Sequence, residues 1–252
     1  MRTGAKYIIL FSIVAAAIAG LSVGGPIPQN PAYHVFADQR TISAIPHFWN
    51  VVTNVPFIVV GMIGMVLVSL GETPGGLPEL RKEYFVFFLG IVATGLGSMY
   101  YHYHPMNATL LWDRLPMALT FMAFFSAIVG EHVSISISRK LFWPLIALGI
   151  ISVLYWYATE QRGGGDLRWY VLVQYLPVLL VPIILLLFKP NLTPVIYLWV
   201  VCGSYVIAKI AESLDKQIFA AGYIVSGHSI KHLSAAFGAY VFTIALRRRT
   251  FV

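Results

Sequence analysis

The chain has 252 residues, of which 58% are apolar and only 11% are charged, and its formal net charge is +7. Soluble domains carry about 25% charged residues, so this composition excludes a soluble globular enzyme, a disordered chain and a disulfide-stapled secreted module. The single cysteine, Cys202, can form neither an intrachain disulfide nor a thiolate metal site. Any metal must therefore be bound by His, Asp or Glu.

Apolar runs long enough to cross a hydrocarbon core of about 30 Å follow one another along the chain. They cover residues 7–23, 48–70, 84–103, 109–130, 141–158, 168–188, 194–213 and 223–246. Because these runs are too long for barrel strands, we expect α-helices throughout. The sequence predicts an all-α polytopic membrane bundle in which seven transmembrane helices form one domain at 25–252, with an additional N-terminal hydrophobic segment at 1–24.

The N-terminal segment fits two interpretations. Arg2 and Lys6 precede a short apolar stretch, and Ala17-Ile18-Ala19 resembles a signal-peptidase site. Residues 1–24 are therefore either an uncleaved transmembrane helix or a signal peptide. In both cases residue 25 emerges on the non-cytoplasmic side.

The distribution of basic residues predicts the orientation. With the N-terminus inside, ten Lys and Arg residues fall in cytoplasmic stretches and five in outer stretches or at their edges. The tail Arg247-Arg248-Arg249 is then a cytoplasmic stop signal rather than a nucleic-acid site. The compact loops favour a bacterial inner membrane with the polar site towards the periplasm, and an ER or Golgi membrane is the eukaryotic equivalent.

Five polar side chains inside the predicted spans are informative, because a charged residue at the bilayer centre costs about 2.5–3.5 kcal/mol. Ser98 and His102 are four residues apart, and so are His228 and His232, so each pair shares one helix face. Asp113 lies near the start of the 109–130 helix. The predicted topology places all five in the outer halves of their helices, where they can converge.

Three neutral imidazoles around one ion are typical of a catalytic zinc site that keeps a fourth position for water. Zinc would lower the pKa of that water to about 7. Asp113 could take or deliver protons, and Ser98 could donate to a developing oxyanion. The pattern therefore predicts His102, His228 and His232 as metal ligands, with Ser98 and Asp113 as catalytic residues.

Three stretches resemble the alkaline ceramidase family, part of a membrane-hydrolase superfamily that also includes the progestin and adipoQ receptors. They are GLGSMYYH at 95–102, LWDRLPM at 111–117 and GHSIKH at 227–232, which carry the pattern SxxxH, Asp, HxxxH. FWNVVTN at 48–54 is similar to the FWN-x-x-S/T-N opening of the first core helix in ceramidases. The resemblance covers roughly residues 35–246.

This resemblance implies an intramembrane zinc-dependent amide hydrolase that cleaves ceramide, or a related N-acyl lipid, to a sphingoid base and a free fatty acid. His102, His228 and His232 would hold zinc, and zinc-activated water would attack the amide carbonyl. Ser98 would steady the oxyanion, and Asp113 would move the proton towards the leaving amine. The lipid substrate would enter sideways from the bilayer. No nucleic-acid partner is expected, and the sequence makes no prediction of oligomeric state.

The chain departs from the family pattern at two positions. His47 stands where animal alkaline ceramidases have a calcium-site Glu directly before FWN, and Asp38 is the nearest acid, so the sequence does not support a calcium dependence. Arg114 follows the catalytic Asp where many ceramidases have Glu, which changes the expected headgroup environment. The alternative function is a seven-helix lipid receptor of the same superfamily with a structural zinc ion. A transporter is a third, for which broken spans and inverted repeats are expected.

Other polar and aromatic residues near the outer boundary have simpler interpretations. Tyr100, Tyr101 and Tyr103 fit an aromatic belt at the membrane interface. A helical ladder of ion pairs is expected for Lys209, Glu212, Asp215 and Lys216. Asp215 has a second possible role, supporting the metal ligands from outside.

Overall fold

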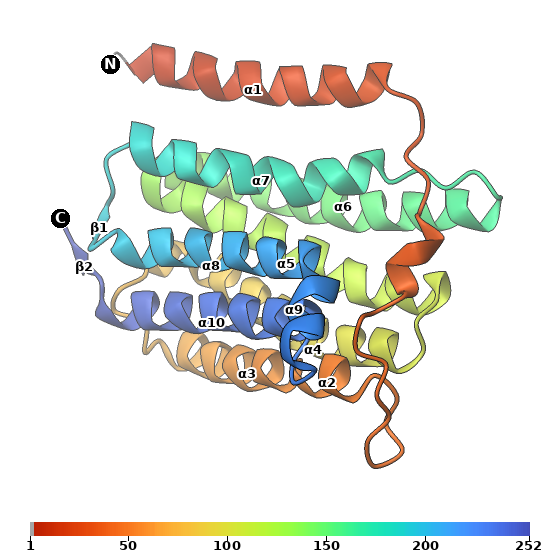
Figure 1. Cartoon of the computed structure of the whole chain (residues 1–252). Coiled ribbons are helices and arrows are strands. Elements are labelled where there is room, and N and C mark those ends of the chain that lie inside the picture. Colours follow the sequence, from red (N-terminus) through yellow and green to blue (C-terminus); the bar gives the residue numbers. More distant parts are fainter. Residues whose placement is uncertain (1–2) are drawn as a thin grey trace.

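The computed structural model describes residues 3–252, which form a bundle of roughly parallel long helices (Figure 1). Eight helical segments of this part of the chain are long and apolar enough to cross a membrane. The prediction of an all-α polytopic bundle is thereby confirmed. The long helices are α1 (Thr3–Val23), α3 (Val55–Leu70), α4 (Arg81–Tyr103), α5 (Asn107–His132), α6 (Ile135–Gln161), α7 (Arg168–Leu187), α8 (Ile196–Ser213) and α10 (Gly227–Arg248).

The short elements lie at the ends of the long helices. They are the α-helices α2 (Phe48–Val52) and α9 (Asp215–Gly222), and the 3-10 helices η1 (Pro31–His34) and η2 (Pro78–Leu80). Strand β1 (Leu192–Thr193) pairs antiparallel with β2 (Thr250–Phe251) beside the C-terminus. The start of α1 and the C-terminus lie at the same end of the bundle, as an even number of spans requires (Figure 1).

Helix α5 occupies the middle of the bundle and packs against α4, α6 and α7, while α10 packs against α8 and α3. The core of the bundle is aromatic. Phe242 of α10 contacts the rings of Phe87 and Phe88 of α4 and of Phe124 of α5, with ring centroids 5.1–6.2 Å apart. Helix α1 lies at the edge of the bundle, beside α7 (Figure 1). The three helices that carry the predicted site, α4, α5 and α10, therefore belong to the centre.

The first core span is not the continuous helix predicted over 48–70. Helix α2 ends at Val52 and α3 begins at Val55, with Thr53 and Asn54 in a turn between them. Pro56 lies in the first turn of α3, where its missing N–H is not needed and its fixed φ favours a new helix start. The break directs two polar residues of an apolar span into the bundle.

The last span begins at Gly227 rather than at residue 223. Ser226 caps α10 because its side chain accepts a hydrogen bond from the N–H of Ser229. The apolar residues Tyr223, Ile224 and Val225 extend the hydropathy pattern but belong to the connection after α9, which ends where Tyr223 adopts φ of 54°. Hydropathy alone does not register a capping residue, so it placed the boundary too early.

The prediction for the basic tail is wrong at one position. Arg247 and Arg248 are exposed, but Arg249 is only 2% exposed and forms an ion pair with Glu131 of α5, with Nη1 2.7 Å from Oε2. The hydroxyl of Tyr84 donates to the same carboxylate at 2.7 Å. Arg249 follows directly on α10, where its N–H still bonds the carbonyl of Ala245, and its side chain reaches Glu131 in the interior.

Candidate metal centre

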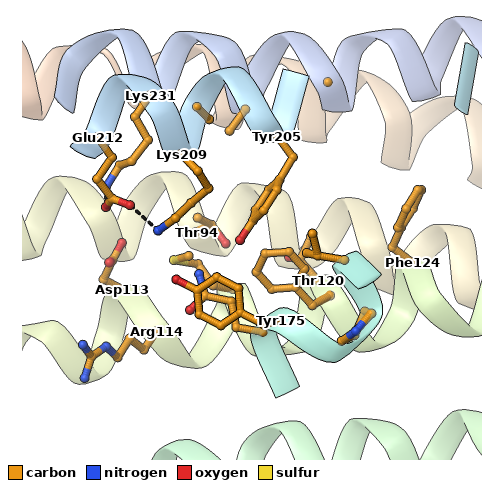
Figure 2. Close-up of a pocket in the computed structure, with 18 of the residues that line it drawn as sticks. Thr94, Asp113, Arg114, Thr120, Phe124, Tyr175, Tyr205, Lys209, Glu212 and Lys231 are labelled. Atoms are coloured by element: carbon orange, nitrogen blue, oxygen red, sulfur yellow. Dashed lines mark hydrogen bonds and ion pairs between the residues drawn. The ribbon is translucent and has the colours of Figure 1, made fainter. Parts of the chain in front are cut away.

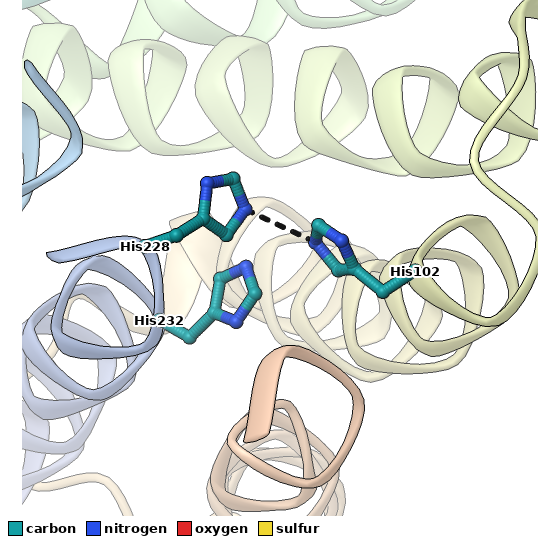
Figure 3. A group of neighbouring side chains, drawn as sticks. All are labelled: His102, His228 and His232. Carbon is teal, nitrogen blue, oxygen red and sulfur yellow. Dashed lines mark hydrogen bonds between the residues drawn. The ribbon is translucent and has the colours of Figure 1, made fainter. Parts of the chain in front are cut away.

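The three histidines predicted as ligands lie close together (Figure 3), at the end of the bundle where α4 ends and α10 begins. Each offers a ring nitrogen, and these atoms all lie within 4.8 Å of one another. His102, His228 and His232 are 1%, 5% and 4% exposed. Two residues of α10 and one of α4 thus form a compact cluster shielded from water.

Helix α10 can bring His228 to this position because Gly227 precedes it. A Cβ at Gly227 would lie 2.0 Å from the carbonyl oxygen of Ala211 in α8, a distance that no side chain tolerates. The start of α10 is therefore in backbone contact with the end of α8. His228 and His232, one turn apart, then face α4 on the same side of the helix.

Asp215 fixes the first turn of α10 from the neighbouring helix α9. Its Oδ1 accepts a hydrogen bond from the backbone N–H of His228 at 2.7 Å, and its Oδ2 accepts from the N–H of Ala37 at 2.9 Å. The expected ion-pair ladder therefore does not include Asp215. Its carboxylate bonds the backbone of a predicted ligand instead, an arrangement compatible with the second interpretation of this residue.

Polar residues of α2 and of the break that follows it hold α10 from the other side. Asn50 accepts hydrogen bonds from the hydroxyls of Ser226 and Ser229 at 3.3 and 3.0 Å. Thr53 Oγ1 and Asn54 Nδ2 lie 3.0 and 3.3 Å from His232 Nδ1. The FWNVVTN motif thus clamps the helix that carries two of the three histidines.

Thr53 determines which nitrogen of His232 is available to a metal. Its hydroxyl donates to the carbonyl of Trp49 at 2.6 Å, so its oxygen can only accept from His232 Nδ1. With this partner Nδ1 would carry the proton and Nε2 would keep its lone pair, while Asn54 Nδ2 donates to the carbonyl of Asn50 at 2.7 Å and only contacts Nδ1. Such an outer hydrogen bond typically orients a metal-binding histidine.

The donor set fits zinc. Zn–N bonds of about 2.0–2.1 Å in a tetrahedron place neighbouring ligand nitrogens about 3.3 Å apart. His102 Nε2 and His228 Nε2 lie 3.2 Å apart (Figure 3). The part of the structure that is described gives His102 Nδ1 no hydrogen-bond partner. Three buried imidazoles that share no acidic partner are suited to hold a cation together.

Ser98 and Asp113 reach the same region because α4 and α5 are in backbone contact. A Cβ at Gly97 would lie 1.9 Å from the carbonyl oxygen of Trp112. Ser98 and Asp113 follow directly on these two residues, and both are buried. They line one cavity together with His232.

This cavity has a volume of about 510 Å³ and a mostly apolar lining between α5, α7, α8 and α10. Charged side chains gather at one end, and Phe124 lies at the other (Figure 2). Pro177 and Pro182 interrupt the hydrogen bonding of α7 along its wall. Volumes of roughly 300–1,000 Å³ with a few polar groups are typical of small-molecule sites.

The polar end of the cavity contains an ion-pair triad. Lys209 and Lys231 both bond to Glu212, and the Lys231 Nζ–Oε1 distance is 3.0 Å (Figure 2). The predicted pairing of Lys209 with Glu212 is confirmed, and Lys231 joins it from α10. Lys216 forms no ion pair within residues 3–252.

The segment between α1 and α2 covers the histidines. The ring of Phe36 packs against His102 and His228 with centroids 4.7 and 4.8 Å apart. Tyr101 is 1% exposed and bonds to His34 at 2.9 Å, so the aromatic-belt interpretation is wrong for Tyr101, although Tyr100 and Tyr103 are exposed. Tyr101 is internal because this segment folds back over α4.

Asp38 of the same segment is engaged by an arginine. Arg40 Nε and Nη2 donate to its two carboxylate oxygens at 2.8 and 2.6 Å. Burial opposes ionisation of Asp38, but these bonds outweigh it and lower the pKa of the carboxyl. Arg40 also bonds the carbonyls of Tyr223 and Ile224, which ties the covering segment to the loop before α10.

Sequence analysis identified the three histidines but gave no role to Asn50, Thr53 and Asn54. The available signal was their position, because three polar side chains within an apolar span need partners. The proline after them also marks a helix start.

A family model described as Ceramidase matches residues 38–250 of this chain. The match includes the α2–α3 break, the three histidines, Ser98 and Asp113. A search of curated proteins finds no match.

Proposed function

Because this chain belongs to the ceramidase family, we propose that it is a zinc-dependent intramembrane hydrolase of ceramide or a related N-acyl lipid. Membership of the family implies a hydrolase that acts on amide bonds. The products would be a sphingoid base, or another lipid amine, and a free fatty acid. The observation that carries the proposal is the cluster of His102, His228 and His232 beside an apolar cavity.

His102, His228 and His232 would hold the zinc ion through ring nitrogens, with His232 Nε2 presented by the Thr53 hydrogen bond. Zinc bound there would supply Lewis-acid chemistry, which polarises a carbonyl and lowers the pKa of water to about 7. Phe36 covers the cluster and excludes bulk water from two of the rings.

Asp113 and Ser98 would act on the amide from α5 and α4. The Asp113 carboxylate lines the same cavity as the predicted catalytic serine, and it can accept a proton from water and return it to the leaving amine. The Ser98 hydroxyl can donate a hydrogen bond to the carbonyl oxygen as negative charge develops there. Both groups lie with His232 at the polar end of the cavity.

The lipid chain would occupy the apolar part of the cavity and enter between α7 and α8. Tyr175 of α7 and Val206 of α8 both line the cavity and are 42% and 52% exposed. An opening between these two helices would give the cavity access to lipid. This geometry favours sideways entry of the substrate from the bilayer.

The test begins with elemental analysis of detergent-purified protein. We expect about one zinc per chain in wild type and less than about one tenth of that in His228→Ala, because two imidazoles do not complete a three-ligand site. The same samples are then assayed for release of fatty acid from N-acyl lipids.

His34→Ala is the matched control, because His34 is also near Phe36 and Tyr101 but does not belong to the cluster. It should keep its zinc. Turnover by a metal-free variant would contradict the proposal, and lipid binding without product would favour the receptor alternative.

A further inference from the structure

Arg114 is a buried guanidinium inside a membrane-spanning helix. It follows Asp113 on α5, is 5% exposed and lines the polar end of the cavity. Arginine within a span is costly, and such residues generally face a functional cavity. The proposed reaction gives Arg114 no role.

The charge of Arg114 lacks an anionic partner within residues 3–252. Its Nη2 donates to the side-chain oxygen of Gln29 at 2.6 Å, which is a neutral acceptor. Its Nη1 is buried and has no hydrogen-bond partner in the described part of the chain. Arg249, the other deeply buried arginine, instead faces both oxygens of Glu131.

Aromatic rings surround the guanidinium. Its Cζ lies 4.3 Å from the ring centroid of Trp156, 5.0 Å from that of Tyr170 and 5.4 Å from that of Tyr33. These cation–π contacts stabilise the charge and hold the group in place. They leave the donor edge at Nη1 free, and a buried charge gains most from an anion that accepts such donors.

The neighbouring charges do not neutralise Arg114. Lys209 and Lys231 share the single carboxylate of Glu212, so this triad has an excess of one positive charge. Asp113 and Arg114 add one charge of each sign. Figure 2 shows these five side chains at the same end of the cavity, which therefore carries a net positive charge.

We propose that the lipid substrate carries an anionic group, a phosphate or a carboxylate, close to its amide bond, and that Arg114 binds this group. A guanidinium matches the planar or forked oxygens of both anions, and hydrogen bonds between charged partners are the strong ones. Because Arg114 and Asp113 both lie at the polar end of the cavity, the anion would lie beside the amide and not at the end of the acyl chain. The inference deepens the proposed function and rests on it for the position of the amide.

The test measures binding, so that it does not depend on turnover. Full-length protein with its bound metal is titrated in detergent with two lipids in which a sulfonamide replaces the amide, so that neither can be hydrolysed. One lipid carries a headgroup phosphate, and the other carries a hydroxyl in its place. We expect the phosphate lipid to bind about tenfold more tightly or better.

Arg114→Gln should reduce this preference to less than about threefold without changing the affinity for the hydroxyl lipid. Arg162→Gln is the matched control, since it removes one positive charge from an exposed loop of the same end and should keep the preference. Arg114→Lys keeps the positive charge but loses the paired N–H donors of the guanidinium, so an intermediate preference for the phosphate lipid is expected.

Equal affinity of wild type for the two lipids would overturn the proposal, even if Arg114→Gln does not fold. An equal loss of affinity for both lipids in folded Arg114→Gln would also overturn the proposal, because it would show that Arg114 has a structural role.

Inorganic phosphate is titrated alone as a third probe. Binding of phosphate in the absence of any advantage for the phosphate lipid would identify a free-anion site and overturn the headgroup assignment. Failure to find zinc or hydrolysis would instead affect only the proposed function.

Discussion

The two ends of the bundle each bury a cluster of polar side chains, and these clusters are built in opposite ways. At the end near the termini, Glu131 receives hydrogen bonds from Arg249 and Tyr84, with distances of 2.7 Å. At the other end, His102, His228 and His232 are brought together without an acidic partner of their own. The first cluster satisfies itself, whereas the second keeps lone pairs available beside a cavity.

This difference suggests that the first cluster serves the stability of the fold and the second serves binding and catalysis. A buried ion pair whose partners satisfy each other matters for stability, because removing one partner leaves the other charge buried and unpaired. Loss of such a pair should therefore affect folding alone. An open cluster adds little to stability until a ligand binds, and its loss should affect binding and turnover. The following predictions test that separation, from the largest expected effect to the smallest.

Asp113→Asn should lower kcat by about 10²–10⁴-fold while the protein keeps its zinc, because an amide cannot accept and return a proton. The measurement is the rate of fatty-acid release from the best N-acyl lipid, with zinc content determined on the same sample. Loss of zinc together with activity would show that Asp113 belongs to the metal cluster and not to proton transfer.

Arg249→Met should destabilise the protein by about 3–5 kcal/mol, because the Glu131 carboxylate is left buried without its partner. Unfolding in a denaturing detergent measures this, and the folded fraction should retain zinc and wild-type kcat. The double variant Glu131→Leu/Arg249→Met should recover much of the loss. A drop in kcat for the folded single variant would mean that the two ends are coupled.

Thr53→Val should weaken zinc binding by about 10–100-fold, since it removes the acceptor that orients His232 Nδ1. Competition with a zinc chelator gives the affinity. Thr243→Val is the control, because Thr243 is a buried threonine of α10 that bonds only the carbonyl of Ala239 in its own helix. An equal effect of the two variants would assign the change to general packing.

The smallest change in stability is expected for a self-satisfied ion pair at the site end of the bundle, that of Asp166 with Arg168. Hydrogen bonds from Arg168, supported by those from Ile27 and Tyr155, lower the pKa of Asp166 from 3.8 to about 2. This contribution to stability is fully present above pH 4 and is lost as the pH falls towards 2. Asp166→Asn should therefore be less stable than wild type by on the order of 1 kcal/mol at pH 6.

The stability difference between wild type and Asp166→Asn should approach zero near pH 2, as measured by unfolding of both proteins across this range. Zinc affinity at pH 7 should be the same in the two proteins. A difference in stability that does not change with pH would contradict the assigned ionisation.

The predictable part of the fold came from composition. Long apolar runs have few structures available in lipid, so the eight spans followed from hydropathy and length. The boundaries that hydropathy missed, at 53–54 and at 223–226, are determined by Pro56 and by the Ser226 cap. Arg249 was misplaced because charge patterning does not reveal that its partner Glu131, 118 residues earlier in the chain, lies beside it.

By itself, the sequence determined the helical class, the order of the spans and the pairing of His228 with His232, because helical periodicity and the hydrophobic thickness of a membrane are local constraints. Only the tertiary structure decided that His102 meets them, that Thr53 orients His232, and that Arg114 faces a cavity without an anionic partner. Close backbone contacts at Gly97, between α4 and α5, and at Gly227, between α10 and α8, place the helices that carry these side chains. The physical reason is that close packing of helices depends on the shapes of both partners, which no single stretch of sequence contains.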